Sequence, residues 1–320
     1  MAVMRRDLNG KIKPPALRRG DTVGIVAPAS NIKPDALQAG CEGLRRMGYE
    51  PFYYESILQQ DLYFAGSVER RVRELHDMFE HEDVRAIVSA RGGYGCNYLV
   101  SHLDLARIRC NPKIFVGYSD VTSLLTLLND EAGITSFHGP MVAKDFTADD
   151  GVDMLSWQSA LGGLATWDVA DSGARALVSG SVEGIFYGGC LPMLVATLGT
   201  PHEIRTDGAI LFLEDIASKP YQIDRMLMHL KLAGKFAGVQ GIVFGEMNDC
   251  VQHRQQGYTL EEVVLRVVGD LGIPVAFGLR SGHVARRNIT LPLGIRASLH
   301  VNTDGAGQVQ LKFLESATTA

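Results

Sequence analysis

The sequence has few features that would mark a secreted, membrane-embedded or metal-binding protein. No apolar run reaches the ~18 residues that a membrane-spanning helix needs. The basic N-terminus has no apolar core or cleavage site, so we expect no signal peptide. The chain has five scattered cysteines, Cys41, Cys96, Cys110, Cys190 and Cys250. Because their number is odd and no Cys-x-x-Cys pair occurs, we expect no disulfide framework, no thiolate zinc site and a reducing cytoplasm as the location.

The charge is also small. The 320 residues carry a net charge of −5, with 21% charged and 46% hydrophobic residues, which is ordinary for a soluble globular protein. A mild, spread charge argues against a nucleic-acid-binding surface. The motifs His-Glu-x-x-His, the EF-hand and the Walker loop are missing, which argues against metal-dependent hydrolysis and phosphoryl transfer. We therefore expect no nucleic-acid partner, no membrane association, no metal and no cofactor.

The length favours two domains. Residues 1–20 contain Pro14-Pro15 and are expected to form an extended arm. Strands alternate with helices over residues 21–145, which predicts a parallel sheet covered on both faces, with ligands beyond the carboxyl ends of its strands. Residues 146–174, rich in Asp, Ala, Thr and Gly, are interpreted as a mobile connection with one short helix, and residues 175–320 as a second α/β domain.

The stretch Lys113–Leu125, KIFVGYSDVTSLL, contains the first candidate for chemistry. It predicts a strand that turns sharply at Ser119 into a helix, which is the geometry of a nucleophile elbow. Val121 stands where the Gly-x-Ser-x-Gly pattern has its second glycine, so the match is incomplete. The alternative is that Ser119 or Asp120 caps the helix, which is the commoner role for such residues.

Two later residues are candidates for the acid and the base of a triad. Glu214 ends an apolar strand, so its carboxylate is expected to face a partly dry site at the strand tip. Its alternative roles are to cap the next turn with Asp215 or to bind Lys219 or Arg225. His283 lies in a glycine-bearing loop after a buried strand, although a lone loop histidine is often merely exposed. The chain order Ser, Glu, His is that of α/β-hydrolase triads.

The turn after the strand Val84–Ser89 is a candidate oxyanion hole. Gly92 and Gly93 present bare backbone N–H groups there, which together with the N–H of Asp120 would hold a tetrahedral intermediate. The alternative is a tight turn with no further role. His138, at the end of another strand, is the reserve base.

Six motifs, in their order and spacing, resemble those of the LD-carboxypeptidase family of serine peptidases, which also contains the microcin C immunity proteins. The resemblance runs from about residue 14 to 301. The motifs are GDTVGIVAPAS, ARGGYG, VGYSDVT, the segment from EGIFYGG to LGTP, LFLEDIASKPYQIDRML and SGHVARRNITLPLG. The resemblance implies a flavodoxin-like parallel-sheet N-terminal domain that carries the nucleophile. It also implies a smaller α/β C-terminal domain that carries the other two triad residues.

The resemblance also implies roles for particular residues. Ser119 matches the family's nucleophile, Glu214 its triad acid and His283 its base, while Gly93 and Asp120 match its oxyanion-hole amides. The implied reaction is hydrolysis of the L,D-peptide bond to the terminal D-Ala of muropeptide tetrapeptides, through an acyl-enzyme. A small muropeptide would be the substrate, in cytoplasmic cell-wall recycling, and the family implies a homodimer.

Substrate recognition adds one further candidate residue and two departures from the family pattern. We hypothesise that Arg91, beside Gly92, binds the terminal carboxylate, against a purely structural role for its charge. The chain departs from many family members at Cys190, where they have Asn, and at Ala217-Ser218, where they have Gly-Glu.

Two other functions remain open from the sequence. The first is hydrolysis of peptidyl- or aminoacyl-nucleotide amides, for which Trp157 or Trp167 would supply an aromatic surface for the base. The second is a non-catalytic module that binds a small ligand, because doubly wound sheets with glycine-rich tips also bind nucleotides.

Overall fold

Two compact units make up the described part of the computed structural model. The structure describes residues 11–171, 173–251, 257–305 and 307–320, so the first half of the expected arm lies outside the described residues. The N-terminal unit contains residues 11–165, 285–294 and 316–320. The C-terminal unit contains the described residues of 166–284 and 295–315.

The N-terminal unit is built on a six-stranded sheet of order β12-β5-β4-β3-β1-β2. Its strands are β1 (Thr22–Val26), β2 (Glu50–Phe52), β3 (Val84–Ser89), β4 (Ile114–Gly117), β5 (Ser136–His138) and β12 (Leu291–Leu293). The first five pair in parallel, and only β12 is antiparallel. The parallel order β2-β1-β3-β4-β5 is that of flavodoxin-like folds, which confirms the predicted fold class.

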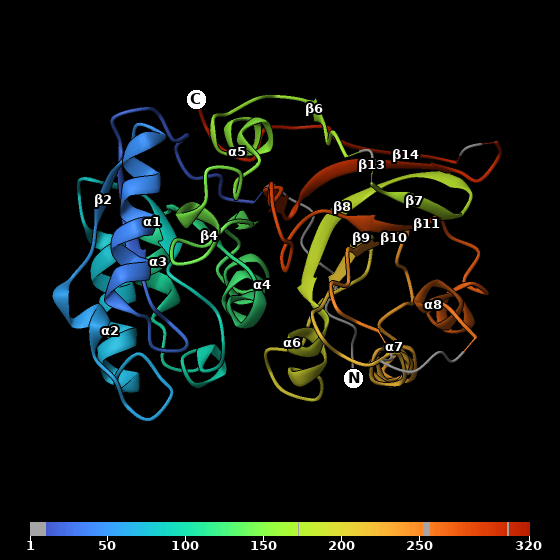
Figure 1. Cartoon of the computed structure of the whole chain (residues 1–320), viewed down its shortest axis with the longest axis horizontal. Coiled ribbons are helices and arrows are strands. Elements are labelled where there is room, and N and C mark those ends of the chain that lie inside the picture. Colours follow the sequence, from blue (N-terminus) through green and yellow to red (C-terminus); the bar gives the residue numbers. More distant parts are fainter. Residues whose placement is uncertain (1–10, 172, 252–256, 306) are drawn as a thin grey trace. The chain divides into compact units, whose positions relative to one another are not determined.

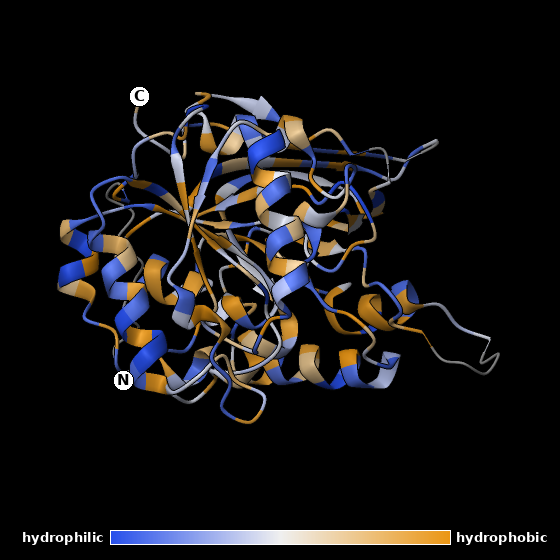
Figure 2. Ribbon diagram, turned by 60° about the vertical axis from the view of Figure 1, so that its left-hand side comes forward, coloured by the Kyte–Doolittle hydropathy of each residue, from blue (hydrophilic) through white to orange (hydrophobic). Residues whose placement is uncertain are grey.

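Helices of this unit cover the sheet with their apolar sides. They are α1 (Pro34–Arg46), α2 (Val68–Glu80), α3 (Leu105–Cys110), α4 (Thr122–Asp130) and α5 (Met154–Leu161). Figure 2 shows blue and orange residues along the same helices, as expected for helices with one buried side. Ser67 caps α2, because its Oγ accepts a hydrogen bond from the N–H of Arg70 at 3.2 Å. Among the described residues, no helix combines the length and the apolarity needed to cross a membrane.

The C-terminal unit contains an eight-stranded mixed sheet of order β6-β14-β13-β8-β9-β10-β11-β7, in which β8 to β11 are parallel. Its strands are β6 (Trp167–Asp168), β7 (Arg175–Val178), β8 (Gly180–Cys190), β9 (Ala209–Glu214), β10 (Gly241–Gly245), β11 (Val275–Leu279), β13 (Ile295–Asn302) and β14 (Gln308–Phe313). Three helices, α6 (Leu191–Ala196), α7 (Pro220–Leu232) and α8 (Leu260–Val268), lie on one face of the sheet (Figure 1). Their apolar residues form one core with β9 to β11.

The division into units differs from the predicted domain boundaries near the C-terminus. Residues 285–294 belong to the N-terminal unit because β12 pairs with β5, with Leu291 opposite His138. The side-chain amide of Asn129 also donates to the carbonyl of Leu293 at 2.9 Å. The predicted second domain ran without interruption to residue 320, since a three-residue strand leaves no periodic pattern in the sequence.

The segment predicted as a mobile connection contains the expected short helix, α5, but much of it is packed. Asp153 caps α5 by accepting from the N–H of Ser156 at 2.9 Å. Trp157 is fully buried, and its indole N–H donates to the hydroxyl of Tyr49 at 3.2 Å. Trp167 is 7% exposed and packs against Phe313. The expectation that one of these tryptophans offers an aromatic surface to a nucleotide base is therefore wrong.

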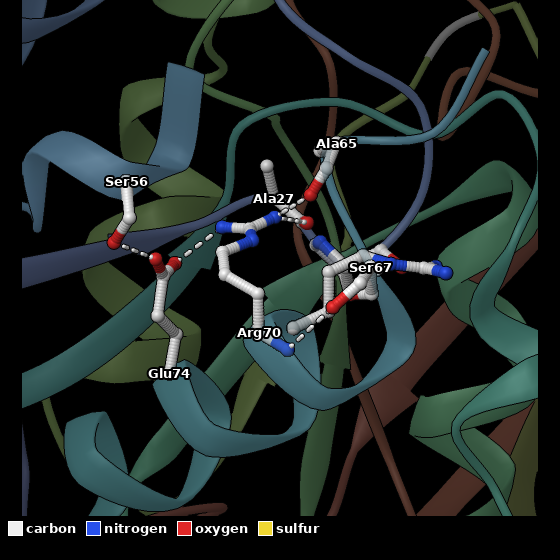
Figure 3. Close-up of polar contacts among 8 residues, drawn as sticks. Ala27, Ser56, Ala65, Ser67, Arg70 and Glu74 are labelled. Carbon is white, nitrogen blue, oxygen red and sulfur yellow. Dashed lines mark hydrogen bonds and ion pairs between the residues drawn. The ribbon is translucent and has the colours of Figure 1, made fainter. Parts of the chain in front are cut away.

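A buried ion pair fastens α2 to the loops at the carboxyl end of β1 (Figure 3). Arg70 and Glu74, one helical turn apart, are joined at 2.5 Å with only 3% and 4% of their side chains exposed. The guanidinium also donates to the carbonyls of Ala27 and Ala65, and Glu74 accepts from the hydroxyl of Ser56. Each charge thus has polar partners inside the fold, as a buried charge requires.

Removal of one member of this pair should strongly destabilise the protein. We expect Arg70→Met to lower the free energy of unfolding by about 3–5 kcal/mol, because it leaves the Glu74 carboxylate buried without its cation. Urea denaturation followed by circular dichroism measures this change.

Arg107→Met is the matched control, since Arg107 pairs with Glu80 at the end of the same helix but both side chains are about 40% exposed. Exposed pairs contribute about 0–1 kcal/mol. Equal losses in the two variants would contradict the proposed role of the buried pair.

Candidate active site

Ser119 occupies a strained turn between a buried strand and a buried helix. All residues of β4 are buried, Tyr118 continues in extended conformation, and Ser119 has a φ of 62°. Left-handed backbone costs a non-glycine residue about 1–2 kcal/mol, so the surrounding fold must impose it. In residues 11–171, which the structure describes without a gap, neither the 3₁₀ turn Ser119–Val121 nor α4 has a side-chain hydrogen bond at its N-cap. The capping alternative is therefore not observed.

The missing second glycine of the elbow pattern has a local explanation. A Cβ atom added to Gly117 would lie 2.7 Å from Cγ1 of Val121. Because Gly117 has no side chain, Val121 can pack against its Cα. The sharp turn therefore forms with valine at the position where the Gly-x-Ser-x-Gly pattern has its second glycine.

The glycine turn approaches Ser119 closely within the same unit. A Cβ added to Gly92 would lie 2.8 Å from Cβ and 3.0 Å from Oγ of Ser119, so only glycine fits there. Gly93 is exposed, and the N–H of the following Tyr94 donates to Ser30 Oγ at 3.1 Å. The structure therefore brings the bare backbone of this turn to the candidate nucleophile.

Two buried side chains fasten the glycine turn. Asp120 Oδ2 accepts a hydrogen bond from the N–H of Cys96 at 2.7 Å, and burial raises the pKa of this carboxyl. Arg71 donates to the carbonyls of Pro28 at 2.8 Å and Gly95 at 3.0 Å. Arg71 was not singled out from the sequence, although its spacing offered a signal. It stands four residues before Leu75 and so lies on the apolar side of α2.

The remaining predicted residues of this unit differ in accessibility. Arg91 is exposed, and its guanidinium donates to the carbonyl of Asn31 at 3.1 Å. His138, the reserve base, is 0% exposed at the end of β5. Full burial makes His138 a poor general base for an external substrate.

Glu214 and His283 form a hydrogen-bonded pair in the C-terminal unit. Glu214 ends the fully buried β9 and is 1% exposed. Its Oε2 lies 2.7 Å from His283 Nδ1 and also accepts from the backbone N–H of His283 at 3.1 Å. A Cβ added to Gly282, whose φ is +94°, would lie 2.5 Å from the same oxygen. The glycine before His283 therefore lets the loop close onto the carboxylate.

This pairing sets the roles of the two ring nitrogens. An ionised carboxylate only accepts hydrogen bonds, so Nδ1 carries the proton and Nε2 is the basic nitrogen. The histidine side chain is 13% exposed. The alternative partners of Glu214 suggested by the sequence are not needed for this arrangement, and Asp215 instead accepts from the N–H of Ile216 at 2.8 Å.

Cys190 lies directly beside this pair. In the parallel register of β8 and β9, Cys190 is opposite Glu214. The residue is 5% exposed, and burial together with the nearby Glu214 carboxylate raises the pKa of its thiol well above the usual range. The sequence identified Cys190 only as a departure from the family, because its proximity to His283 depends on the fold.

Comparison with known proteins matches both halves of the chain to one family. Residues 23–139 match the LD-carboxypeptidase N-terminal domain, and residues 183–299 match the LD-carboxypeptidase C-terminal domain. The chain is 38% identical over 292 residues to the probable murein peptide carboxypeptidase of Bacillus subtilis, covering 90% of this chain and 91% of that protein.

Solved structures agree with this match. The muramoyltetrapeptide carboxypeptidase of Oxalobacter formigenes is 31% identical, with a TM-score of 0.81 over 93% of this chain and 100% of that chain. The microcin C7 self-immunity protein MccF of Escherichia coli is 28% identical over 316 residues, which are 88% of this chain and 90% of that protein. A structure of MccF in complex with glutamyl sulfamoyl guanosine is 25% identical, with a TM-score of 0.85 over 96% of this chain and 99% of that chain. The chain therefore belongs to the LD-carboxypeptidase family of serine peptidases.

Proposed function

We propose that this chain hydrolyses the L,D-peptide bond to the terminal D-Ala of murein tetrapeptides, with Ser119, His283 and Glu214 as its triad. The observation that carries the proposal is the strained elbow at Ser119, held against the bare backbone of Gly92, in a chain of this family. Residues held in strained backbone cluster at functional sites, where the strain is part of the mechanism. Cytoplasmic cell-wall recycling and a homodimer, which the family resemblance implies, are part of the same proposal.

The proposed reaction has two steps. His283 Nε2 takes the proton of Ser119 Oγ, and the oxygen attacks the scissile carbonyl. The imidazolium then gives that proton to the departing D-Ala nitrogen, which leaves the acyl chain on Ser119. In the second step water, activated by the same nitrogen, releases the acyl group.

Neighbouring groups stabilise the charges that develop. Glu214 keeps the proton on Nδ1 and stabilises the imidazolium, as the third member of such triads does. The N–H groups of Gly93 and Asp120 would donate to the oxyanion, and that of Asp120 belongs to the helical turn that starts at Ser119. The proposal requires that Ser119 Oγ and His283 Nε2 lie within hydrogen-bond reach in the complex with substrate.

Replacement of Ser119 separates catalysis from stability. Ser119→Ala and Ser119→Gly should both lose D-Ala release from a murein tetrapeptide, measured by mass spectrometry. The free energy of unfolding should also be about 1 kcal/mol larger for Ser119→Gly than for Ser119→Ala, because glycine adopts positive φ without strain. Ser119→Gly should therefore have the higher melting temperature. Release of D-Ala by Ser119→Ala would show that the elbow serine is not the nucleophile.

Glu214→Gln tests the acid. This change should lower kcat by roughly 10⁴-fold with little change in KM, as when a triad aspartate is replaced by its amide. The adjacent Asp215→Asn is the matched control, because Asp215 is also buried and its carboxylate accepts from the local N–H of Ile216 and the hydroxyl of Ser218. Similar losses in both variants would assign the effect to general disturbance of the strand end.

Arg91→Ala tests the carboxylate-binding hypothesis. KM for the tetrapeptide should rise roughly 10- to 100-fold, which corresponds to a charge-assisted hydrogen bond of about 1.5–3 kcal/mol. Hydrolysis of an uncharged ester should change little, and Arg91→Lys, which keeps the charge, should recover part of the tetrapeptide binding. Equal effects on tetrapeptide and ester would mean that Arg91 only orders the loop through the carbonyl of Asn31.

A second candidate substrate is a peptidyl- or aminoacyl-nucleotide amide. The similarity to MccF, solved in complex with glutamyl sulfamoyl guanosine, favours it. The burial of Trp157 and Trp167 counts against it, because neither offers a surface to a base. Failure of the wild type to release D-Ala, together with cleavage of an aminoacyl-sulfamoyl adenosine, would select this substrate class instead.

A further inference from the structure

Three side chains with metal-binding atoms converge in the C-terminal unit. Cys190 is the last residue of β8, Glu214 is the last residue of β9, and His283 lies in the loop after β11. One ligand atom from each, the thiol sulfur, a carboxylate oxygen and an imidazole nitrogen, lies within 4.8 Å of the other two.

The strand geometry explains why these atoms meet. Cys190 and Glu214 are register partners on neighbouring parallel strands, so their side chains point to the same face of the sheet. The backbone and the ring of His283 are both tied to Glu214 Oε2. The three positions are therefore set by the sheet and by a closed loop, and not by mobile surface side chains.

The set of ligands is selective. A thiolate, an imidazole and a carboxylate are the ligand types that bind zinc, and three protein ligands with an open fourth position are common in zinc sites. Thiolates favour zinc and similar metals over magnesium and calcium. Ligand atoms around zinc stand roughly 3.5 Å apart, given Zn–S and Zn–N bonds of about 2.3 and 2.0 Å, so small side-chain rotations would close the cluster.

We propose that Cys190, Glu214 and His283 form a binding site for zinc or a similar thiophilic divalent ion, and that the bound ion inhibits the peptidase. The ion would occupy Glu214 and His283, so the histidine could no longer take a proton from the nucleophile. Binding itself is independent of the proposed function, whereas the inhibition rests on it.

The proton balance gives a further expectation. A cysteine binds a metal ion as the thiolate, so the Cys190 thiol must lose its proton when the ion binds. The ion replaces the thiol proton, which goes to solvent. Binding through Nδ1 of His283 moves the ring proton to Nε2 and breaks the hydrogen bond to Glu214 Oε2. No electron is transferred. Affinity for the ion should therefore rise with pH, as is general for thiolate sites.

The sequence prediction of no metal site rested on short local motifs. The three ligands are separated by 24 and 69 positions in the printed numbering, since 214 − 190 = 24 and 283 − 214 = 69. No such motif includes them.

Cobalt titration of the metal-free protein tests binding directly. Co²⁺ should bind with a near-ultraviolet thiolate charge-transfer band, and Zn²⁺ should displace it. Cys190→Ala and Cys190→Asn should lose the band and bind Zn²⁺ roughly 100-fold or more weakly, because even partners outside the ligand shell cost about 10–100-fold when mutated. Cys110→Ser is the matched control, since it removes an exposed cysteine elsewhere, and it should keep the band.

The activity measurement is the ratio of D-Ala release with and without Zn²⁺ for each variant. Zn²⁺ should suppress D-Ala release by the wild type and by Cys110→Ser, reversibly with a chelator, and should leave the ratio for Cys190→Asn near one.

A cobalt band that survives in Cys190→Ala, or no band in the wild type, would overturn the site and would show that the thiol only hydrogen-bonds to Glu214. A band in a protein without peptidase activity would support the site and reject the proposed function. Activity insensitive to Zn²⁺ in a protein that has the band would overturn the inhibition.

Discussion

The left-handed backbone at Ser119 is the constraint on which the candidate nucleophile and the glycine turn of the N-terminal unit depend. A φ of 62° at a serine persists because both flanking elements are fixed: β4 is buried throughout, and the residues of α4 from Thr122 to Asn129 are buried as well. The bare backbone of Gly92 can then approach the serine, and Arg71 and Asp120 hold the rest of that turn in place. The strain is thus sustained by packing and by buried hydrogen bonds together.

The pair of Glu214 and His283 in the C-terminal unit depends on a different interaction. Its central group is a carboxylate at the end of a buried strand, and Glu214 Oε2 accepts from both the ring and the backbone of His283. A buried carboxylate needs such partners, because desolvation without compensation is expensive. The same burial places a thiol and an imidazole beside one carboxylate, which is why the proposed triad acid is also one of the proposed metal ligands.

Sequence reasoning succeeded where the structure is local and continuous. The strand Val84–Ser89 was predicted with its observed bounds, and the apolar strand that ends at Glu214 was also predicted, because strands buried on both faces are unbroken apolar runs. The short strands β7 and β12 were missed, since their pairing depends on distant partners and leaves no pattern. Trp157 and Trp167 were predicted to offer an exposed surface but are buried, because their packing partners are also distant in the sequence. The proximity of Cys190 to Glu214 could not be predicted, because it depends on the register between β8 and β9. Motifs named the pair of Glu214 and His283, but only the fold supplied their hydrogen bond.

The path of the chain has a consequence for how this protein can be divided. Among the described residues, the chain passes between the two units at 165/166, 284/285, 294/295 and 315/316, so neither unit is one continuous stretch. A fragment ending at residue 165 would lack β12 and would leave β5 as an open strand whose backbone groups invite pairing with another molecule. Truncation, fusion or recombination at 165/166 would therefore yield an aggregation-prone N-terminal fragment. Because each unit contains segments from both sides of this boundary, evolution could exchange the two units only together.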